Sequence, residues 1–143
     1  MLVKDVMNAD VKTIGPNETV KKSAILMNEY DIGSLIVVDD EKMVGIITER
    51  DLLKKIVAKS KESSKVKVRN VMNRRVIMID PETSLSDAAD IMNEHKIKKL
   101  PVLHEDNLVG IVTATDIIAA QPKMVEDLSK LFALQKQKTH VAG

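Results

Sequence analysis

Apolar positions along this chain follow two patterns, and polar residues between them mark the turns. Four short segments are almost continuously apolar and rich in β-branched residues, which is typical of strands covered on both faces. They are residues 35–38, 43–47, 100–103 and 108–112. Polar residues 39–42 and 104–107 separate the members of each pair. Each pair therefore predicts a β-hairpin.

A helical spacing precedes each hairpin. Val20, Ala24 and Met27 recur at i, i+4 and i+7, which predicts a helix over about residues 19–30. The matching helix in the second half begins at Ser84, where the sequence Ser-Leu-Ser-Asp resembles a capping box. The other expected elements are short strands at 11–14 and 76–79 and helices that begin at Thr48 and Thr113.

These elements arise from an internal repeat. Residues 6–53 align with residues 71–118 without a gap, and 18 of the 48 positions are identical. Each copy reads β-α-β-β-α, and a unit of about 50 residues buries too little apolar surface to be stable alone. We therefore expect an α/β (α+β) fold in which the two repeats pack sheet to sheet around a pseudo-two-fold axis.

Composition shifts place the boundaries. We expect repeat 1 at residues 1–58, a linker rich in Ser and Lys at 59–67, repeat 2 at 68–120, and a C-terminal helix with a tail at 121–143. Pro122 suits the first turn of that last helix. Its apolar stripe, which packs on the body or meets a partner, consists of Met124, Val125, Leu128, Leu131 and Phe132.

Charge and composition exclude several classes of protein. A formal net charge of +1 argues against a dedicated nucleic-acid binder, and the absence of cysteine excludes disulfides and thiolate-bound metals. The chain lacks an apolar run of the roughly 18 residues that a membrane span requires, so we expect a cytoplasmic protein. Tyr30 and Phe132 are the only aromatic residues, so the core must be aliphatic.

The pattern Gly-h-h-Thr-x-x-Asp, in which h is apolar, closes both repeats at residues 45–51 and 110–116. Each copy runs from a strand into a helix, whose first N–H groups and dipole favour an anion. The Asp adds two acceptor oxygens, so the pattern fits a sugar diol beside a phosphate. The same residues also form a capping box that needs no ligand. Both interpretations stay open at this point.

The sequence resembles a tandem pair of CBS domains, a Bateman module, over about residues 3–120. The resemblance rests on Val-Met-Asn ahead of each first strand, on Leu100-Pro101-Val102, and on the two Gly-h-h-Thr-x-x-Asp patterns in register. It implies a regulatory module that binds AMP, ADP, ATP, S-adenosylmethionine or a relative in clefts between the repeats. It also implies a homodimer. The protein that such a module would regulate is not named by the sequence.

The resemblance also implies which residues touch the ligand. The ribose hydroxyls would be held by Asp51 and Asp116 beside Thr48 and Thr113, and the base pockets would be lined by Thr13, Ile14, Met78 and Ile79. Arg50 and Lys98 are candidates for a phosphate, although each is equally well explained as a solvated surface charge. Because Glu49-Arg50 in the first corner becomes Ala114-Thr115 in the second, we expect the phosphate at the first corner.

Two other classes of protein compete with this interpretation. One is a structural or interaction module with vestigial clefts that uses the helix at 122–134. The other is a nucleic-acid-associated regulator that uses Arg69, Arg74, Arg75 and the lysine-rich linker. An enzyme is the least expected class, because nothing resembles a nucleophile–base pair or a P-loop. The three histidines lack metal-ligand spacing, so we assign neither catalytic nor metal-binding residues.

Overall fold

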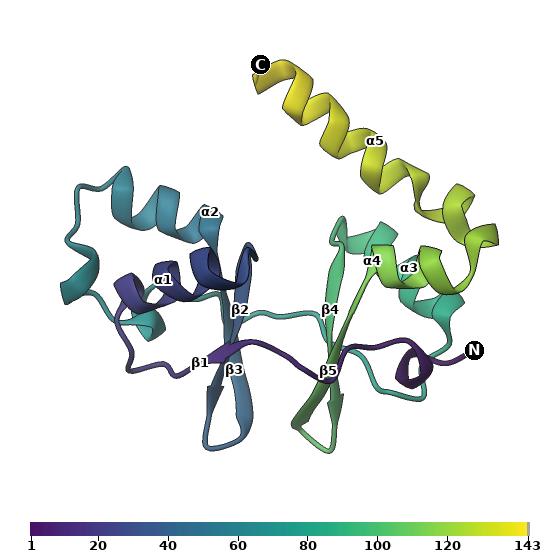
Figure 1. Ribbon diagram of the computed structural model, residues 1–143, viewed down its shortest axis with the longest axis horizontal. Coiled ribbons are helices and arrows are strands. Elements are labelled where there is room, and N and C mark those ends of the chain that lie inside the picture. The colour runs from purple at the N-terminus through teal and green to yellow at the C-terminus, as the bar shows by residue number, and fades with distance from the viewer. Residues whose placement is uncertain (143) are drawn as a thin grey trace. The chain divides into compact units, whose positions relative to one another are not determined.

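The computed structural model describes residues 1–142, with the side chains of residues 1–133, as a mixed α+β protein (Figure 1). The chain divides into two compact units. The repeat-1 unit is Val11–Val76, and the repeat-2 unit combines Met1–Asp10 with the chain from Ile77 onward. The expected C-terminal helix is present and belongs to the repeat-2 unit.

The repeat-1 unit has the expected β-α-β-β-α order. Its elements are β1 (Thr13–Ile14), α1 (Val20–Tyr30), β2 (Ser34–Asp39), β3 (Lys42–Thr48) and α2 (Glu49–Leu52). α2 continues as the π-helical turn η2 (Leu53–Val57), and two 3₁₀ turns follow, η3 (Ser63–Lys65) and η4 (Val68–Asn70). β2 pairs antiparallel with β3 and parallel with β1, so β2 lies between them.

The repeat-2 unit repeats this plan with additions at both ends. Its elements are η1 (Val3–Asp5), α3 (Leu85–His95), β4 (Lys99–His104), β5 (Asn107–Thr113), α4 (Ala114–Ala120), η5 (Pro122–Met124) and α5 (Val125–Ala142). The strand expected at 76–79 is reduced to a single bridge. Ile79 donates to the Pro101 carbonyl at 3.0 Å and accepts from Leu103 at 2.9 Å. The Asn73 side chain accepts from Arg75 N–H at 3.0 Å, as Asn8 accepts from Asp10 N–H at 2.9 Å, so the extended segment begins later than predicted in both repeats.

Side-chain caps begin the two long repeat helices, and left-handed residues end them. Thr19 accepts from Lys22 N–H at 3.1 Å, and Ser84 accepts from Asp87 N–H at 3.0 Å. Only this hydroxyl half of the expected capping box at Ser84 is seen among the described residues. Asp31 (φ 53°) and Lys96 (φ 57°) end α1 and α3 in the left-handed conformation.

Both hairpins turn through two residues with positive φ. These residues are Asp40 (53°) and Glu41 (69°) in one hairpin, and Glu105 (49°) and Asp106 (68°) in the other. Two positive φ angles in a two-residue loop are the geometry of a type I′ turn, whose twist suits the flanking strands. The polar segments at 39–42 and 104–107 are therefore hairpin turns, as predicted.

Each Val-Met-Asn segment packs in the unit of the other repeat. Val6-Met7-Asn8 lies in the repeat-2 unit, where Asn8 exchanges backbone hydrogen bonds with Ile111 at 2.8 and 2.9 Å. Val71-Met72-Asn73 lies in the repeat-1 unit, where Asn73 pairs with Ile46 in the same way at 2.8 and 3.0 Å. Each unit thus completes its fold with the segment that precedes the opposite repeat in the sequence.

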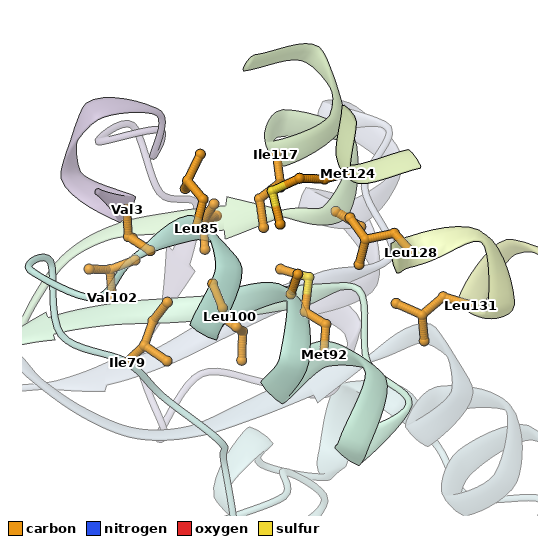
Figure 2. Packing of buried hydrophobic residues seen from close by; sticks show 14 residues of the cluster. Val3, Ile79, Leu85, Met92, Leu100, Val102, Ile117, Met124, Leu128 and Leu131 are labelled. Carbon is orange, nitrogen blue, oxygen red and sulfur yellow. The ribbon is translucent and has the colours of Figure 1, made fainter. Parts of the chain in front are cut away.

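Each unit has an aliphatic core, as the near absence of aromatic residues predicts. The repeat-1 core includes Val20, Leu35, Val37, Ile47 and Val68. The repeat-2 core gathers side chains from both ends of the chain, and Val3 lies near Leu85 and Val102 (Figure 2). α5 adds Leu128 and Leu131 to this core, and Met124 of η5 is buried with them. Val125 and Phe132 are exposed, so only part of the apolar stripe predicted for the last helix packs on its own unit.

Candidate functional site

Each Gly-h-h-Thr-x-x-Asp pattern forms a tight corner between a strand and a helix. Thr48 ends β3 and caps α2, and its hydroxyl accepts from Asp51 N–H at 3.2 Å. The Oδ2 atom of Asp51 in turn accepts from Thr48 N–H at 2.9 Å and from the Thr48 hydroxyl at 3.0 Å. Thr113 and Asp116 repeat the reciprocal backbone pair, at 3.1 and 3.0 Å, between β5 and α4. Both corners are complete capping boxes.

The start of each helix also has fewer free donors than the sequence suggests. Glu49 N–H donates to the Gly33 carbonyl at 3.0 Å, and Ala114 N–H donates to the Lys98 carbonyl at 2.8 Å. With the Asp N–H bound to the Thr hydroxyl, two of the first three N–H groups of each helix are paired. An anion at either corner would therefore need cationic side chains as well as backbone donors.

The glycine of the pattern has a packing role. A Cβ on Gly45 would lie 2.8 Å from the Asn73 carbonyl oxygen and 2.9 Å from the Met72 sulfur. A Cβ on Gly110 would lie 2.6 Å from the Met7 sulfur. These distances are shorter than any normal contact, so the glycines admit the Val-Met-Asn segments beside the strands that lead to the corners.

Lys55 makes the two corners chemically different, and sequence reasoning overlooked it. Its Nζ lies 3.2 Å from Oδ1 of Asp51 and donates to the Val71 carbonyl at 2.7 Å. The Asp51 side chain is only 17% exposed, so both of its oxygens are engaged in a partly buried place. An Asp followed four residues later by a Lys on a helix is the signal that could have revealed this pair.

The second corner has no such cation. The residue four positions after Asp116 is Ala120, which is also the counterpart of Lys55 in the repeat. Oδ2 of Asp116 accepts from Thr113 N–H, and within the described residues its Oδ1 makes no hydrogen bond or ion pair. The repeat-2 corner therefore presents a partly buried carboxylate with one acceptor oxygen available to a hydroxyl group.

The first-strand residues pair with the strand that neighbours the corner strand in each unit, and they differ in burial. Thr13 is exposed and pairs with Ile36 on β2, two strand spacings or about 10 Å from β3. Ile14 and Ile79 are buried in the cores of their own units, whereas Met78 is exposed. Thr13 and Met78, rather than the two isoleucines, present side chains that a ligand can reach directly.

The two candidate phosphate-binding cations also differ. Arg50 is exposed at the second position of α2, beside Asp51. Lys98 places its Nζ 5.2 Å from the centre of the Phe132 ring on α5, and burial lowers the pKa of this lysine. Lys98 thus has a packing role beside α5, which the sequence did not suggest.

Two other classes of site find no support in the described part of the chain. No three His, Asp or Glu side chains there are grouped to hold a metal ion. None of the helices within that part is both long and apolar enough to cross a lipid bilayer.

Comparison with known proteins identifies the family to which these duplicated corners belong. The sequence profile described as "CBS domain" matches residues 3–58 and again residues 68–123. The chain belongs to the CBS-domain family. Because the profile matches twice, the chain carries a tandem pair of CBS domains.

Several relatives share the whole tandem arrangement. The CBS domain-containing protein YhcV of Bacillus subtilis is 33% identical over 138 residues, covering 96% of this chain and 98% of its own. The solved structure of Hypoxic Response Protein I with two coordinated zinc ions superposes with a TM-score of 0.75 at 33% identity, covering 85% of this chain and 98% of that chain. The matching curated relative, hypoxic response protein 1, is from Mycobacterium tuberculosis.

A third similarity concerns signalling. A solved protein from Burkholderia ambifaria, described as a candidate signal-transduction protein with CBS domains, superposes with a TM-score of 0.71 at 32% identity. The match covers 78% of this chain and 82% of that chain. The CBS-domain proteins similar to this chain thus include ones of regulatory, signal-transduction type.

Proposed function

We propose that this CBS-domain protein is a regulatory module that binds an adenine nucleotide or adenosyl compound at its Thr-x-x-Asp corners. AMP, ADP, ATP and S-adenosylmethionine are the ligands that the family resemblance favours. The proposal assigns no catalytic step to the chain. Binding shifts the population of conformations, and a separate target protein responds to that shift.

The observation that carries the proposal is the carboxylate at the repeat-2 corner. Asp116 uses one oxygen to cap α4 and keeps the other available, at a partly buried position. A ribose diol supplies two hydroxyl donors to such an oxygen, and hydrogen bonds to a charged acceptor are the stronger kind. The cap holds the carboxylate in place before the ligand arrives, which lowers the entropic cost of binding.

The repeat-1 corner has a different chemistry. Lys55 already pairs with Oδ1 of Asp51, and Arg50 lies exposed on the same helical turn. A ribose would have to displace Lys55, whereas a phosphate would find two cations. We therefore assign the ribose preference to the repeat-2 corner and retain the repeat-1 corner as the better place for a phosphate.

A thermal-shift panel tests the proposal on the full chain. The ligands are AMP, ADP, ATP and S-adenosylmethionine, with inorganic phosphate and ribose 5-phosphate as controls that lack the base. A ligand at about 100 times its Kd should stabilise the protein by about 2.7 kcal/mol, which is a shift of several degrees. The absence of a shift with every adenosyl ligand would contradict the proposal.

One observation favours a second candidate function. Thr48 with Asp51, and Thr113 with Asp116, satisfy one another without any ligand. The corners would then be structural caps, and the chain would act as an interaction module. In that case the Asp116→Asn substitution should lower the Tm of the free protein but leave no ligand response to lose.

A further inference from the structure

The positive charge of this chain is concentrated in one of its two units. Val11–Val76 carries 14 basic and 9 acidic residues, a formal charge of +5, whereas the rest of the chain carries 8 basic and 12 acidic residues, a formal charge of −4. The overall charge of +1 is therefore the sum of two units of opposite sign. A low net charge argues against nucleic-acid binding only where the charges are evenly spread, so the charge of each unit has to be considered separately.

Most of the positive charge lies in one basic segment, residues 54–75, which follows α2 and includes η2, η3 and η4. This segment contains nine basic residues, all exposed, and Glu62 as its single acidic residue. Within the part of the chain that the structure describes, only Lys55 and Lys65 of the nine form ion pairs, with Asp51 and Glu62. The seven without an ion pair are Lys54, Lys59, Lys61, Lys67, Arg69, Arg74 and Arg75.

Backbone hydrogen bonds hold the second half of the basic segment beside the start of α1 (Figure 1). Val68 N–H donates to the Glu18 carbonyl at 2.9 Å, and Arg69 N–H donates to the Pro16 carbonyl at 2.9 Å. The Val68 side chain is fully buried in the repeat-1 core. The charges are therefore carried on an ordered backbone, which lowers the entropic cost of binding a partner.

Three arginines and one lysine gather at the end of the basic segment. Nη2 of Arg74 lies 3.5 Å from the Arg69 carbonyl oxygen, and Lys55 Nζ donates to the Val71 carbonyl at 2.7 Å. Arg75 follows Arg74 directly. We define the arginine cluster as Arg69, Arg74 and Arg75, with Lys55 beside it. Guanidinium groups match the geometry of phosphate oxygens and bind them through two parallel hydrogen bonds, so a cluster of arginines suits a phosphorylated partner.

The equivalent place in the repeat-2 unit lacks these charges. With the 65-residue shift of the repeat, Arg74-Arg75 corresponds to Ala9-Asp10. The backbone turn is nevertheless the same, because the asparagine that ends each Val-Met-Asn segment accepts from Asp10 N–H at 2.9 Å and from Arg75 N–H at 3.0 Å. The fold of this turn therefore does not require arginine, and the charges of the cluster need another explanation.

We propose that the arginine cluster and the neighbouring lysines of the basic segment bind the phosphate backbone of a nucleic-acid duplex. Residues 54–75 include no aromatic side chain on which the bases of a single strand could stack. Residues 58–75 include no exposed large apolar side chain that could insert into a lipid surface. Phosphate contacts carry no direct sequence information, so the binding is independent of base sequence. It also does not depend on the proposed binding of an adenosyl ligand.

Fluorescence anisotropy of a labelled duplex of mixed sequence, titrated with the full chain, tests the proposal. If each arginine of the cluster neutralises one phosphate, the logarithm of the association constant should fall with the logarithm of the salt concentration with a slope of about −2.7. This slope is an affinity loss of about 40-fold between about 50 and about 200 mM salt. Duplex DNA and duplex RNA are measured separately, and a second duplex of different sequence should bind equally well.

A double variant tests the cluster itself. Arg74→Ala combined with Arg75→Asp installs the pair that occupies the equivalent turn of the other unit, so the protein should fold. We expect it to weaken duplex binding by at least about tenfold and to reduce the salt slope to about −0.9. The matched control is Lys123→Ala combined with Lys130→Asp, which makes the same change of net charge at exposed positions of the repeat-2 unit and should keep the natural slope.

Arg69→Ser is a second, milder variant and should lower the magnitude of the slope by about 0.9. Thermal unfolding shows whether each variant is folded. No binding of either duplex at about 50 mM salt, a slope near zero, or equal losses in the two double variants would overturn the proposal. Binding to phosphatidylserine vesicles without binding to a duplex would overturn it as well, because the cluster would then face an anionic membrane surface.

Discussion

Lys55 and Ala120 occupy equivalent positions, four residues after the two corner carboxylates, and this difference makes the corners unequal. The Lys55 ammonium neutralises Asp51 and also bonds to the Val71 carbonyl. Asp116 has no basic residue four positions later on its own helix. One residue per repeat therefore decides which carboxylate is available to a hydroxyl group.

Transferring the cation to the second corner tests this explanation. We expect Ala120→Lys to place an ammonium near Asp116 and to weaken binding of the adenosyl ligand about fivefold, since a partly exposed ion pair contributes up to about 1 kcal/mol. Ala120→Gln is the control of similar length without the charge, and it should keep the natural affinity. Equal effects of Lys and Gln in isothermal titration calorimetry would point to steric obstruction instead.

The corner glycines make a second prediction at the scale of single residues. Gly45→Ala and Gly110→Ala should each destabilise the protein by about 1–3 kcal/mol, because the new methyl group overlaps a neighbouring segment. Gly15→Ala is the control, since its Cβ would have only an ordinary contact at 3.8 Å. Urea denaturation measures all three, and a Gly15→Ala variant as unstable as the other two would contradict the packing explanation.

At this scale the sequence predicts types of contact better than partners. Thr48, Asp51, Thr113 and Asp116 form the capping boxes that their spacing indicates. The role of Lys98 could not be predicted, because its ring partner Phe132 is 34 positions away and reaches it only through the fold of α5. Local spacing reveals contacts within a turn of helix, and it carries no information on such distant ones.

Among the elements, the hairpins contain the least favourable local geometry. Both two-residue turns place an acidic residue at the second positive-φ position, where glycine is preferred. A side chain in the left-handed region at that position costs about 1 kcal/mol relative to glycine. The hairpins form because both strands of each are held by the core, so their apolar pattern overrides the turn residues.

A favourable turn sequence should therefore stabilise the protein. We expect Asp40→Asn combined with Glu41→Gly to raise the free energy of unfolding by about 1 kcal/mol, or the Tm by roughly 4 °C. Glu105→Asn combined with Asp106→Gly makes the same change in the second hairpin and should raise the free energy of unfolding by a similar amount. Differential scanning calorimetry measures both, and an unchanged Tm would show that the turns carry no strain.

The elements themselves are largely predictable, because the helices and hairpin strands follow strong periodic patterns with clear caps. α1 and α3 begin after Thr19 and Ser84 as expected. Each of the four hairpin strands extends one residue beyond its predicted range at both ends. The first strands are shorter than predicted, since only Thr13, Ile14 and Ile79 find a partner strand. Pairing of so short a segment depends on the neighbouring strand, which a local pattern does not contain.

For the molecule as a whole, the main feature is that each unit is completed by the segment before the other repeat. The sequence places Val6-Met7-Asn8 at the opening of repeat 1, yet this segment packs in the repeat-2 unit. The identical opening of repeat 2 packs in the repeat-1 unit. The two segments have the same sequence, Val-Met-Asn. The sequence pattern therefore does not show whether each segment packs in the unit of its own repeat or, as observed, in the unit of the other repeat.

Hydrogen exchange on a core variant distinguishes the two pairings. Val3 is fully buried in the repeat-2 core, so Val3→Ala should destabilise that unit by about 2 kcal/mol. Protection should fall first in β4 and β5, whereas β2 and β3 should keep theirs. Val68→Ala is the matched variant in the repeat-1 core and should give the opposite pattern. Loss of protection in β2 and β3 on Val3→Ala would contradict the exchange.

We propose that Asp116 holds the ribose of an adenosine-containing ligand. Isothermal titration of the ligand that gives the largest thermal shift, on the natural protein and on Asp116→Asn, tests it directly. Asp87→Asn, which alters another acid in the first turn of a helix, is the control. We predict a loss of affinity of about tenfold or more for Asp116→Asn, as expected for a lost hydrogen bond to a charged group, and none for Asp87→Asn. Equal affinity of the natural protein and Asp116→Asn would contradict the account.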